Sequence, residues 1–194
     1  MKTLSLENSY TSLPTDFYRF TKPEVMPGLK LLKLNSELAD LLDLDKDFLL
    51  SEGGKMFLGG QKLPETTRSI SLAYAGHQFG QLVPQLGDGR ALLLGDKICK
   101  DNQRRDIQLK GSGKTSFSRG GDGRAGIGPV IREYLVSESM HYLDVPTTRS
   151  LAILLTGEKV IRDTIQPGAI LVRVAKSHIR VGTFQFFAIR DQKD

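Results

Sequence analysis

The sequence predicts an α+β fold in which an antiparallel sheet carries one long helix. Two observations favour this class. Four short apolar runs are bounded by Gly, Asp, Pro or Lys, as is typical of strands, and one longer segment between the second and third run has helical periodicity. The composition, with 39% hydrophobic and 25% charged residues, is ordinary for a globular protein and argues against disordered or fibrous classes.

The first two apolar runs, 91–94 and 107–109, are separated by a turn that contains Asp101 and Asn102. This connection is too short for a crossover helix. We therefore expect the two strands to pair as an antiparallel hairpin.

The segment 127–143 is predicted to be a helix, with Pro129 near its start, where a missing N–H costs little. On a helical wheel its apolar residues form two stripes, Ile127, Ile131 and Tyr134 in one and Val136, Met140 and Leu143 in the other. Two stripes predict that both sides of the helix are packed. Glu133 lies at the edge of the second stripe.

The last two apolar runs, 150–155 and 169–175, are rich in Ile, Leu and Val and are separated by turn residues. They are predicted to be strands, although 150–155 is also compatible with a short helix. Residues 1–68 differ: they hold four of the eight prolines and one helix that begins near Asn35. We expect an extension at 1–68 that packs on a main domain at 69–194.

Several classes of protein are disfavoured. The sequence has no apolar stretch long enough to span a membrane and no apolar core of a secretory signal. Cys99 is the single cysteine, and His77, His141 and His178 are scattered, so spacing predicts neither a disulfide nor a metal site. These features predict a cytoplasmic protein.

The net charge of +5 suggests an anionic partner. The basic residues are spread out and lack interleaved aromatic residues, so we expect a small phosphate ligand and no nucleic acid. Gly87, Gly89 and Arg90 precede a predicted strand, and glycines there allow close approach of a ligand while the guanidinium could meet a phosphate. A plain turn is the alternative, since Leu92 replaces the third glycine of a dinucleotide fingerprint.

Lys110 ends the strand at 107–109 and is followed by Gly-Ser-Gly-Lys-Thr. A Walker A motif is excluded, because Gln108 stands where that motif needs a glycine. Glu133 on the following helix should point partly inward, and a carboxylate there needs a cationic partner. Lys110 is the natural partner, and a glycine turn, a strand lysine and a helix glutamate together reproduce the small lobe of protein kinases. A surface pairing of Glu133 with a neighbouring basic residue is the alternative.

The segment 120–128 holds five glycines and leads into the predicted helix, so its backbone N–H groups could cradle an anion. A flexible connector is the alternative. Arg173 and Arg180 lie at the end of the last strand and could add charge to the same site.

The sequence resembles the selenoprotein O family, also called the YdiU family, of kinase-like protein adenylyltransferases. The resemblance is carried by AYAGHQFG at 73–80, QLGDGRALLLGD at 85–96, QLKGSGKTSFSRGGDGRAGIGPVIREYL at 108–135, RSLAILLTGE at 149–158 and GAILVRVAKSHIRVGTFQFFA at 168–188. It implies transfer of AMP from ATP to Ser, Thr or Tyr hydroxyls of proteins, with the nucleotide flipped relative to its orientation in kinases.

The resemblance also implies roles for individual residues. Lys110 binds phosphates and Glu133 orients Lys110, and the remaining nucleotide contacts are Gly87, Gly89, Arg90, Asp122, Gly123, Arg173 and Arg180.

Family members are much longer than this sequence, whose last residue is Asp194. Their second lobe supplies the general base and the ligands for Mg²⁺ or Mn²⁺, so the resemblance implies that the base lies beyond Asp194. We therefore expect a kinase-like small lobe without its partner lobe, which binds ATP weakly and is inactive alone. A regulatory module that binds nucleotide or protein without chemistry is the alternative.

Overall fold

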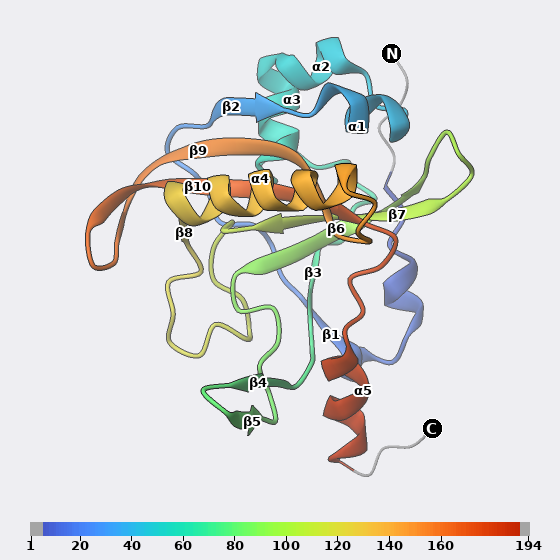
Figure 1. Cartoon of the computed structure of the whole chain (residues 1–194), viewed down its shortest axis with the longest axis vertical. Coiled ribbons are helices and arrows are strands. Elements are labelled where there is room, and N and C mark those ends of the chain that lie inside the picture. Colours follow the sequence, from blue (N-terminus) through green and yellow to red (C-terminus); the bar gives the residue numbers. More distant parts are fainter. Residues whose placement is uncertain (1–5, 191–194) are drawn as a thin grey trace.

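The computed structural model describes residues 6–190, and its centre is an eight-stranded antiparallel sheet (Figure 1). The strands are β1 (Tyr18–Phe20), β2 (Lys30–Leu34), β3 (Ile70–Leu72), β6 (Ala91–Ile98), β7 (Arg104–Lys110), β8 (Ala125–Gly126), β9 (Arg149–Ile161) and β10 (Ile165–Ala175). They lie in the order β1-β3-β6-β7-β10-β9-β2, and β8 pairs with β10. The α+β class with an antiparallel sheet is confirmed.

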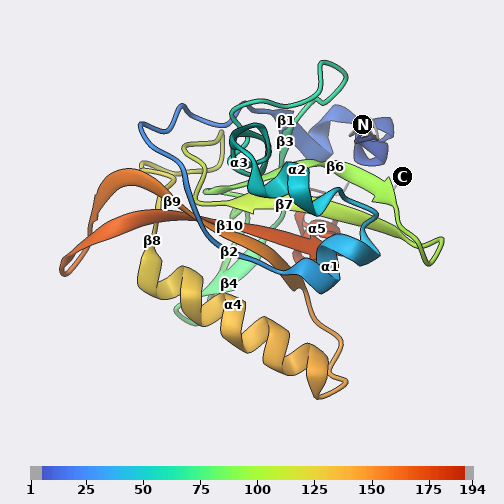
Figure 2. The ribbon, with the colours of Figure 1, turned by 90° about the horizontal axis from the view of Figure 1, so that it is seen from above.

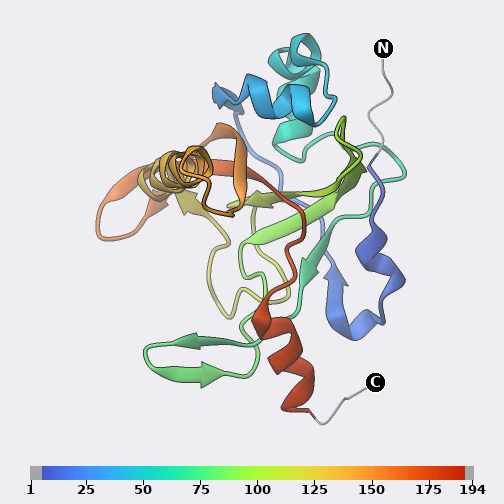
Figure 3. The same ribbon diagram turned by 45° about the vertical axis from the view of Figure 1, so that its right-hand side comes forward.

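The four predicted strands are all present. β6 and β7 form the predicted antiparallel hairpin, and both are longer than their apolar runs. The run at 150–155 is part of strand β9, so its reading as a short helix is wrong; pairing with β10 along the length of β9 fixes it in the sheet. A separate hairpin of β4 (Gly76–Gln78) and β5 (Gln81–Val83) stands apart from the sheet (Figure 3).

The helices are α1 (Ser36–Leu41), α2 (Lys46–Leu50), α3 (Glu52–Leu58), α4 (Ile127–Tyr142) and α5 (Val181–Ala188), and two short 3₁₀ helices precede β1, η1 (Ser9–Ser12) and η2 (Thr15–Phe17). The predicted start of the first α-helix is confirmed, because Asn35 caps it by accepting a hydrogen bond from the Leu38 amide at 3.0 Å.

Alternation along β10 assigns the helices to opposite faces of the sheet. Ile170, Val172 and Val174 face the side that α1, α2 and α3 cover, and Leu171 faces α4. Figure 2 shows α4 along one side of β10 and α2 and α3 across β10 from it.

One expectation for α4 is wrong. Its buried residues are Val130, Tyr134, Ser137 and Glu138. In the predicted second stripe Met140 is partly buried, whereas Val136 is 57% and Leu143 73% exposed. The helix covers a sheet face and no other described element covers its outer side (Figure 2). Residues 136 and 143 therefore have nothing to pack against.

The largest core cluster joins the N-terminal segment to the sheet. Leu38, Leu42 and Phe57 pack with Leu109 and Val172. β1 and β2 also form the two ends of the sheet order. Cys99, at the end of the β6–β7 hairpin, is buried in the same cluster. Among residues 6–190, no helix is long and apolar enough to cross a membrane.

Candidate functional site

The alternation of side chains along β7 brings Lys110 close to Glu133, as predicted. On β7, Ile107 and Leu109 enter the core under α1 to α3, so Gln108 and Lys110 point to the α4 side. Glu133 lies on α4 less than two turns from its start. The Lys110 ammonium contacts Glu133 Oε2 in an ion pair. The two side chains that the sequence paired therefore meet in the structure.

Glu133 is shared by two cations. Its Oε1 atom accepts a hydrogen bond from Arg173 Nη1 at 3.2 Å, and Arg173 comes from the neighbouring strand β10. The exposed fractions of the side chains are 23% for Lys110, 29% for Glu133 and 10% for Arg173. Two positive charges thus compete for one half-buried carboxylate.

The pKa shifts reflect this excess of positive charge. Burial lowers the pKa of Lys110; the hydrogen bond to Glu133 opposes that shift, and repulsion from Arg173 adds to it. Burial alone would raise the pKa of Glu133, but the hydrogen bond from Lys110 and the charge of Arg173 outweigh it, so the pKa lies below its ordinary value. An anionic ligand would relieve the surplus.

A buried polar chain continues from Arg173 to the glycine turn before β6. Arg173 Nη2 donates to Gln108 Oε1, and Gln108 Nε2 donates to Asp88 Oδ2 at 3.1 Å. Asp88 is 2% exposed and also accepts from the Leu72 amide at 3.2 Å and the Tyr74 hydroxyl at 3.0 Å. Burial raises the pKa of Asp88. The sequence interpretation included Asp88 only as a member of the Gly87–Arg90 turn and missed Gln108 as a site residue; the signal for Gln108 was a polar side chain between two apolar ones on β7.

A cavity of about 420 Å³ opens beside this chain. All the predicted nucleotide contacts line it, namely Gly87, Gly89, Arg90, Lys110, Asp122, Gly123, Arg173 and Arg180. Glu133 does not line this cavity. It contacts Lys110 and borders, with Val136 and Met140, a separate hollow of about 210 Å³.

Gly87 and Gly89 are required because the turn packs closely against Phe117, which the sequence did not show. Gly87 has φ +61°, and a Cβ on it would lie 2.3 Å from the Phe117 ring. A Cβ on Gly89 would lie 2.9 Å from the Phe117 carbonyl oxygen. These glycines therefore let the turn pack against residues 111–124, which we call the glycine-rich loop.

Among the described residues, seven cationic side chains and two carboxylates line the cavity. The sequence interpretation missed three of the cations, which are Arg119, Arg124 and Arg162. Arg162 forms a bidentate ion pair with Asp122, at 2.8 Å for both contacts. This pair lowers the pKa of Asp122 to about 2.

Arg90, Arg119 and Arg180 have no carboxylate partner within residues 6–190. The Arg180 guanidinium lies 5.1 Å above the Tyr74 ring. Arg119 donates one hydrogen bond, to Gln78 Oε1 at 3.4 Å. Guanidinium groups that lack a carboxylate partner among the described residues suit phosphate oxygens, which accept paired hydrogen bonds.

The cavity does not fit a metal ion by its own ligands. Asp88 already accepts three hydrogen bonds, and Asp122 is held by Arg162. Within the described part of the chain, no three His, Cys, Asp or Glu side chains gather in one place. The arrangement is suited to binding an anion, and these residues supply no coordination shell for Mg²⁺.

No residue of the cavity was predicted to be the general base of the expected reaction. The sequence interpretation puts it beyond Asp194, and Asp194 itself lies outside the described residues 6–190. The location of the base therefore stays a prediction.

Comparison with known proteins identifies the family of the chain. A family profile described as "Protein adenylyltransferase SelO" matches residues 1–194. The chain is 62% identical over 188 residues to a "Protein nucleotidyltransferase YdiU" of Rhodopseudomonas palustris, and 58% identical over 188 residues to one of Bradyrhizobium diazoefficiens. Both alignments cover 97% of this chain and 38% of the relative, so the chain spans well under half the length of these proteins. The chain belongs to the SelO family.

Proposed function

We propose that the described residues form the ATP-binding part of an enzyme that transfers AMP to protein hydroxyl groups. The carrying observation is the Lys110–Glu133 ion pair at a cavity lined by seven cationic side chains in the described residues. A nucleoside triphosphate is strongly anionic, so the surplus positive charge of this cavity supports it as the ligand. The names of the family and of its relatives support nucleotidyl transfer as the reaction.

The fold supports a kinase-like small lobe as the scaffold. In such a lobe a strand lysine holds phosphates and a helix glutamate holds the lysine. β7 carries Lys110, α4 carries Glu133, and the Gly87–Arg90 turn lies directly before β6. We propose that the glycine turn, the glycine-rich loop, Arg173 and Arg180 contact the nucleotide, and that residues 1–68 and 69–194 are its two units.

Transfer of AMP forms a bond between an acceptor oxygen and the α-phosphorus and breaks the bond to the bridging oxygen, which releases pyrophosphate. The acceptor hydroxyl must also lose its proton to a base. The described carboxylates of the cavity are engaged by other donors, so neither fits that role. We propose that these residues bind and orient ATP, and that the base and the ligands for Mg²⁺ or Mn²⁺ lie in the part of the longer relatives that follows the position of Asp194.

Lys110→Ala is expected to weaken ATP binding by about 10- to 100-fold, since a hydrogen bond to a charged group contributes about 1.5–3 kcal/mol. Titration calorimetry with ATP, with and without Mg²⁺, measures this. Lys33→Ala, which removes an exposed lysine from β2, is the matched control and should bind as the unmodified protein does. Equal affinities for the Lys110 and Lys33 variants would count against the proposed site.

A further inference from the structure

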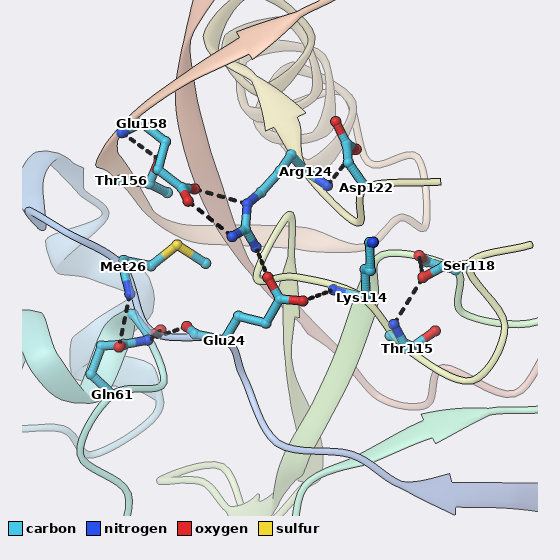
Figure 4. A network of polar contacts seen from close by, with 12 residues as sticks. Glu24, Met26, Gln61, Lys114, Thr115, Ser118, Asp122, Arg124, Thr156 and Glu158 are labelled. Atoms are coloured by element: carbon cyan, nitrogen blue, oxygen red, sulfur yellow. Dashed lines mark hydrogen bonds and ion pairs between the residues drawn. The ribbon is translucent and has the colours of Figure 1, made fainter. Parts of the chain in front are cut away.

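Arg124 lines the cavity, yet its charge is already satisfied. Its Nε atom lies 2.8 Å from Glu158 Oε2 and its Nη2 atom donates to Glu158 Oε1 at 2.9 Å. On the other side its Nη1 atom lies 2.7 Å from Glu24 Oε2. Figure 4 shows the guanidinium between the two carboxylates. With one positive and two negative charges in this cluster, Arg124 is poorly suited to bind phosphate.

Glu24 reaches this cluster from the N-terminal segment between β1 and β2. Its side chain also accepts a hydrogen bond from the Lys114 amide at 3.1 Å, and its own amide donates to the Ser112 carbonyl at 3.0 Å. Gly113 lies between these contacts, and a Cβ there would lie 2.6 Å from Glu24 Cγ. Glu24 is thus fitted against the first residues of the glycine-rich loop.

The side chain of Gln61 fixes the backbone around Glu24. Its carbonyl accepts from Gln61 Nε2 at 2.9 Å, and Gln61 Oε1 accepts from the Met26 amide at 3.1 Å (Figure 4). Glu158 is likewise fixed, because its amide donates to Thr156 Oγ1 at 3.3 Å within the β9–β10 region. Both carboxylates therefore belong to anchored backbone outside the loop.

Glu24 and Glu158 both bind Arg124 and in this way hold the two ends of the glycine-rich loop in place. The ends are joined to each other by a bridge between Ser112 and Arg124 and by a hydrogen bond from the Gly113 amide to the Gly123 carbonyl at 3.2 Å. Glu24 contacts the first end and Arg124, which belongs to the second end, contacts Glu24 and Glu158. The loop between these ends carries Arg119 and other residues that line the cavity.

We propose that Glu24, Arg124 and Glu158 are positioning residues for the nucleotide site. They fix the position of the glycine-rich loop relative to the Gly87–Arg90 turn. In that position the backbone of the loop and the side chain of Arg119 contact the phosphates of the bound nucleotide. This inference rests on the proposed function, and it gives the N-terminal segment a part in ligand binding. None of the three residues needs to touch the nucleotide for this role.

The test is Glu24→Gln, which keeps the shape of the side chain and an oxygen for the Lys114 amide but removes the charge that holds Arg124. ATP affinity by calorimetry should fall about 3- to 10-fold, the range expected for one lost hydrogen-bonded contact. Backbone hydrogen exchange over residues 111–124 should become faster. Glu24→Asp, which keeps the charge, should retain more affinity than Glu24→Gln. Glu65→Gln, an exposed carboxylate of the same segment, is the matched control and should change neither measurement.

The outcomes separate this inference from the proposed function. If the unmodified protein binds ATP and Glu24→Gln binds it equally well, the positioning role is overturned. If the unmodified protein does not bind ATP, the proposed function fails and the role in nucleotide binding fails with it. Hydrogen exchange then tests only the contact between Glu24 and the loop: faster exchange confined to 111–124 in Glu24→Gln supports that contact, and unchanged exchange overturns it. Glu158→Gln gives the same comparison from the other anchor if Glu24→Gln does not fold.

Discussion

Glu133 is the residue on which the charge balance of the site depends. It is the carboxylate that Lys110 and Arg173 share, and both cations come from neighbouring strands, β7 and β10. Without it two positive charges would face each other in a partly buried site, an arrangement that costs several kcal/mol when no anion is present. Glu133 thus makes the close approach of Lys110 and Arg173 compatible with the folded protein in the absence of a bound anion.

Asp122 has the opposite relation to the cavity, because Arg162 neutralises it. Its pKa of about 2 lies below the ordinary 3.8, so the folded protein binds this proton more weakly than the unfolded chain does. The pair therefore adds stability above the unfolded pKa, and this contribution is lost as the pH falls towards 2. We expect Asp122→Asn to be less stable than the unmodified protein at about pH 5, with a gap that narrows by about pH 3.

Urea unfolding at about pH 5, 4 and 3 measures that gap. The side chains of this pair are 41% and 46% exposed, so solvent screening keeps the gap small. Asp163→Asn alters a neighbouring exposed carboxylate that makes no ion pair with a described residue, and it should show no such trend. A gap that is the same at all three pH values would contradict the assignment.

At this scale the sequence could predict part of the cavity lining but not which partners the lining residues contact. Lys110 and Glu133 followed from strand and helix periodicity, since both positions are set by local spacing. Asp88 and Arg124 were not assigned, because their partners come from remote segments. A pattern read along the chain does not show that Glu24 meets Arg124 across 100 residues.

The glycine-rich loop shows how an element can depend on backbone contacts. Gly123 has φ +69°, and a Cβ on it would lie 2.1 Å from the Gly113 carbonyl carbon. Gly120 has φ +82° but no atom within 4 Å of such a Cβ. The two glycines share the left-handed backbone and differ in the space around them.

Gly123→Ala and Gly120→Ala therefore form a matched pair. Both should carry the cost of a left-handed alanine, about 1–2 kcal/mol. Gly123→Ala should lose more, because the two ends of the loop must separate, and its ATP affinity should fall as well. Thermal unfolding and calorimetry measure both effects. Equal losses of stability and unchanged affinity in the two variants would show that the joined ends of the loop do not matter.

Elements with strong local patterns were predicted, and those that depend on distant partners were not. β6, β7, β9 and β10 each contain an apolar run, and α4 has a helical period. β1 and β3 have three residues each and gain their stability from pairing with each other between segments far apart in the sequence. The second stripe of α4 was predicted to be buried because apolar character alone does not reveal which side of a helix meets another element.

For the whole molecule, the main core extends across the proposed boundary at residue 68. Leu38, Leu42 and Phe57 from one side pack with Leu109 and Val172 from the other. A core shared in this way favours a single cooperative unfolding transition. The division at residue 68 stays a prediction, and stability measurements can decide whether it marks two folding units.

Phe57→Ala removes a side chain that is 1% exposed and should cost about 3–5 kcal/mol. The expected result is one transition at lower denaturant, detected equally by far-UV circular dichroism and by hydrogen exchange in β7 and β10. Leu50→Ala, at a 55% exposed position of α2, is the control and should shift stability by no more than about 0.5 kcal/mol. Two separate transitions in Phe57→Ala, with β10 protected through the first, would support independent units.

Because Cys99 is buried, the rate at which its thiol is alkylated can report local opening of the structure. Cys99 carries the one thiol of the sequence, and it lies 4% exposed in the main core at the end of the β6–β7 hairpin. Iodoacetamide can alkylate it only when that region opens, because the closed structure shields the sulfur. The rate of carbamidomethylation in native buffer therefore reports how often the hairpin that bears Lys110 loses its packing, from a mass shift at a single atom.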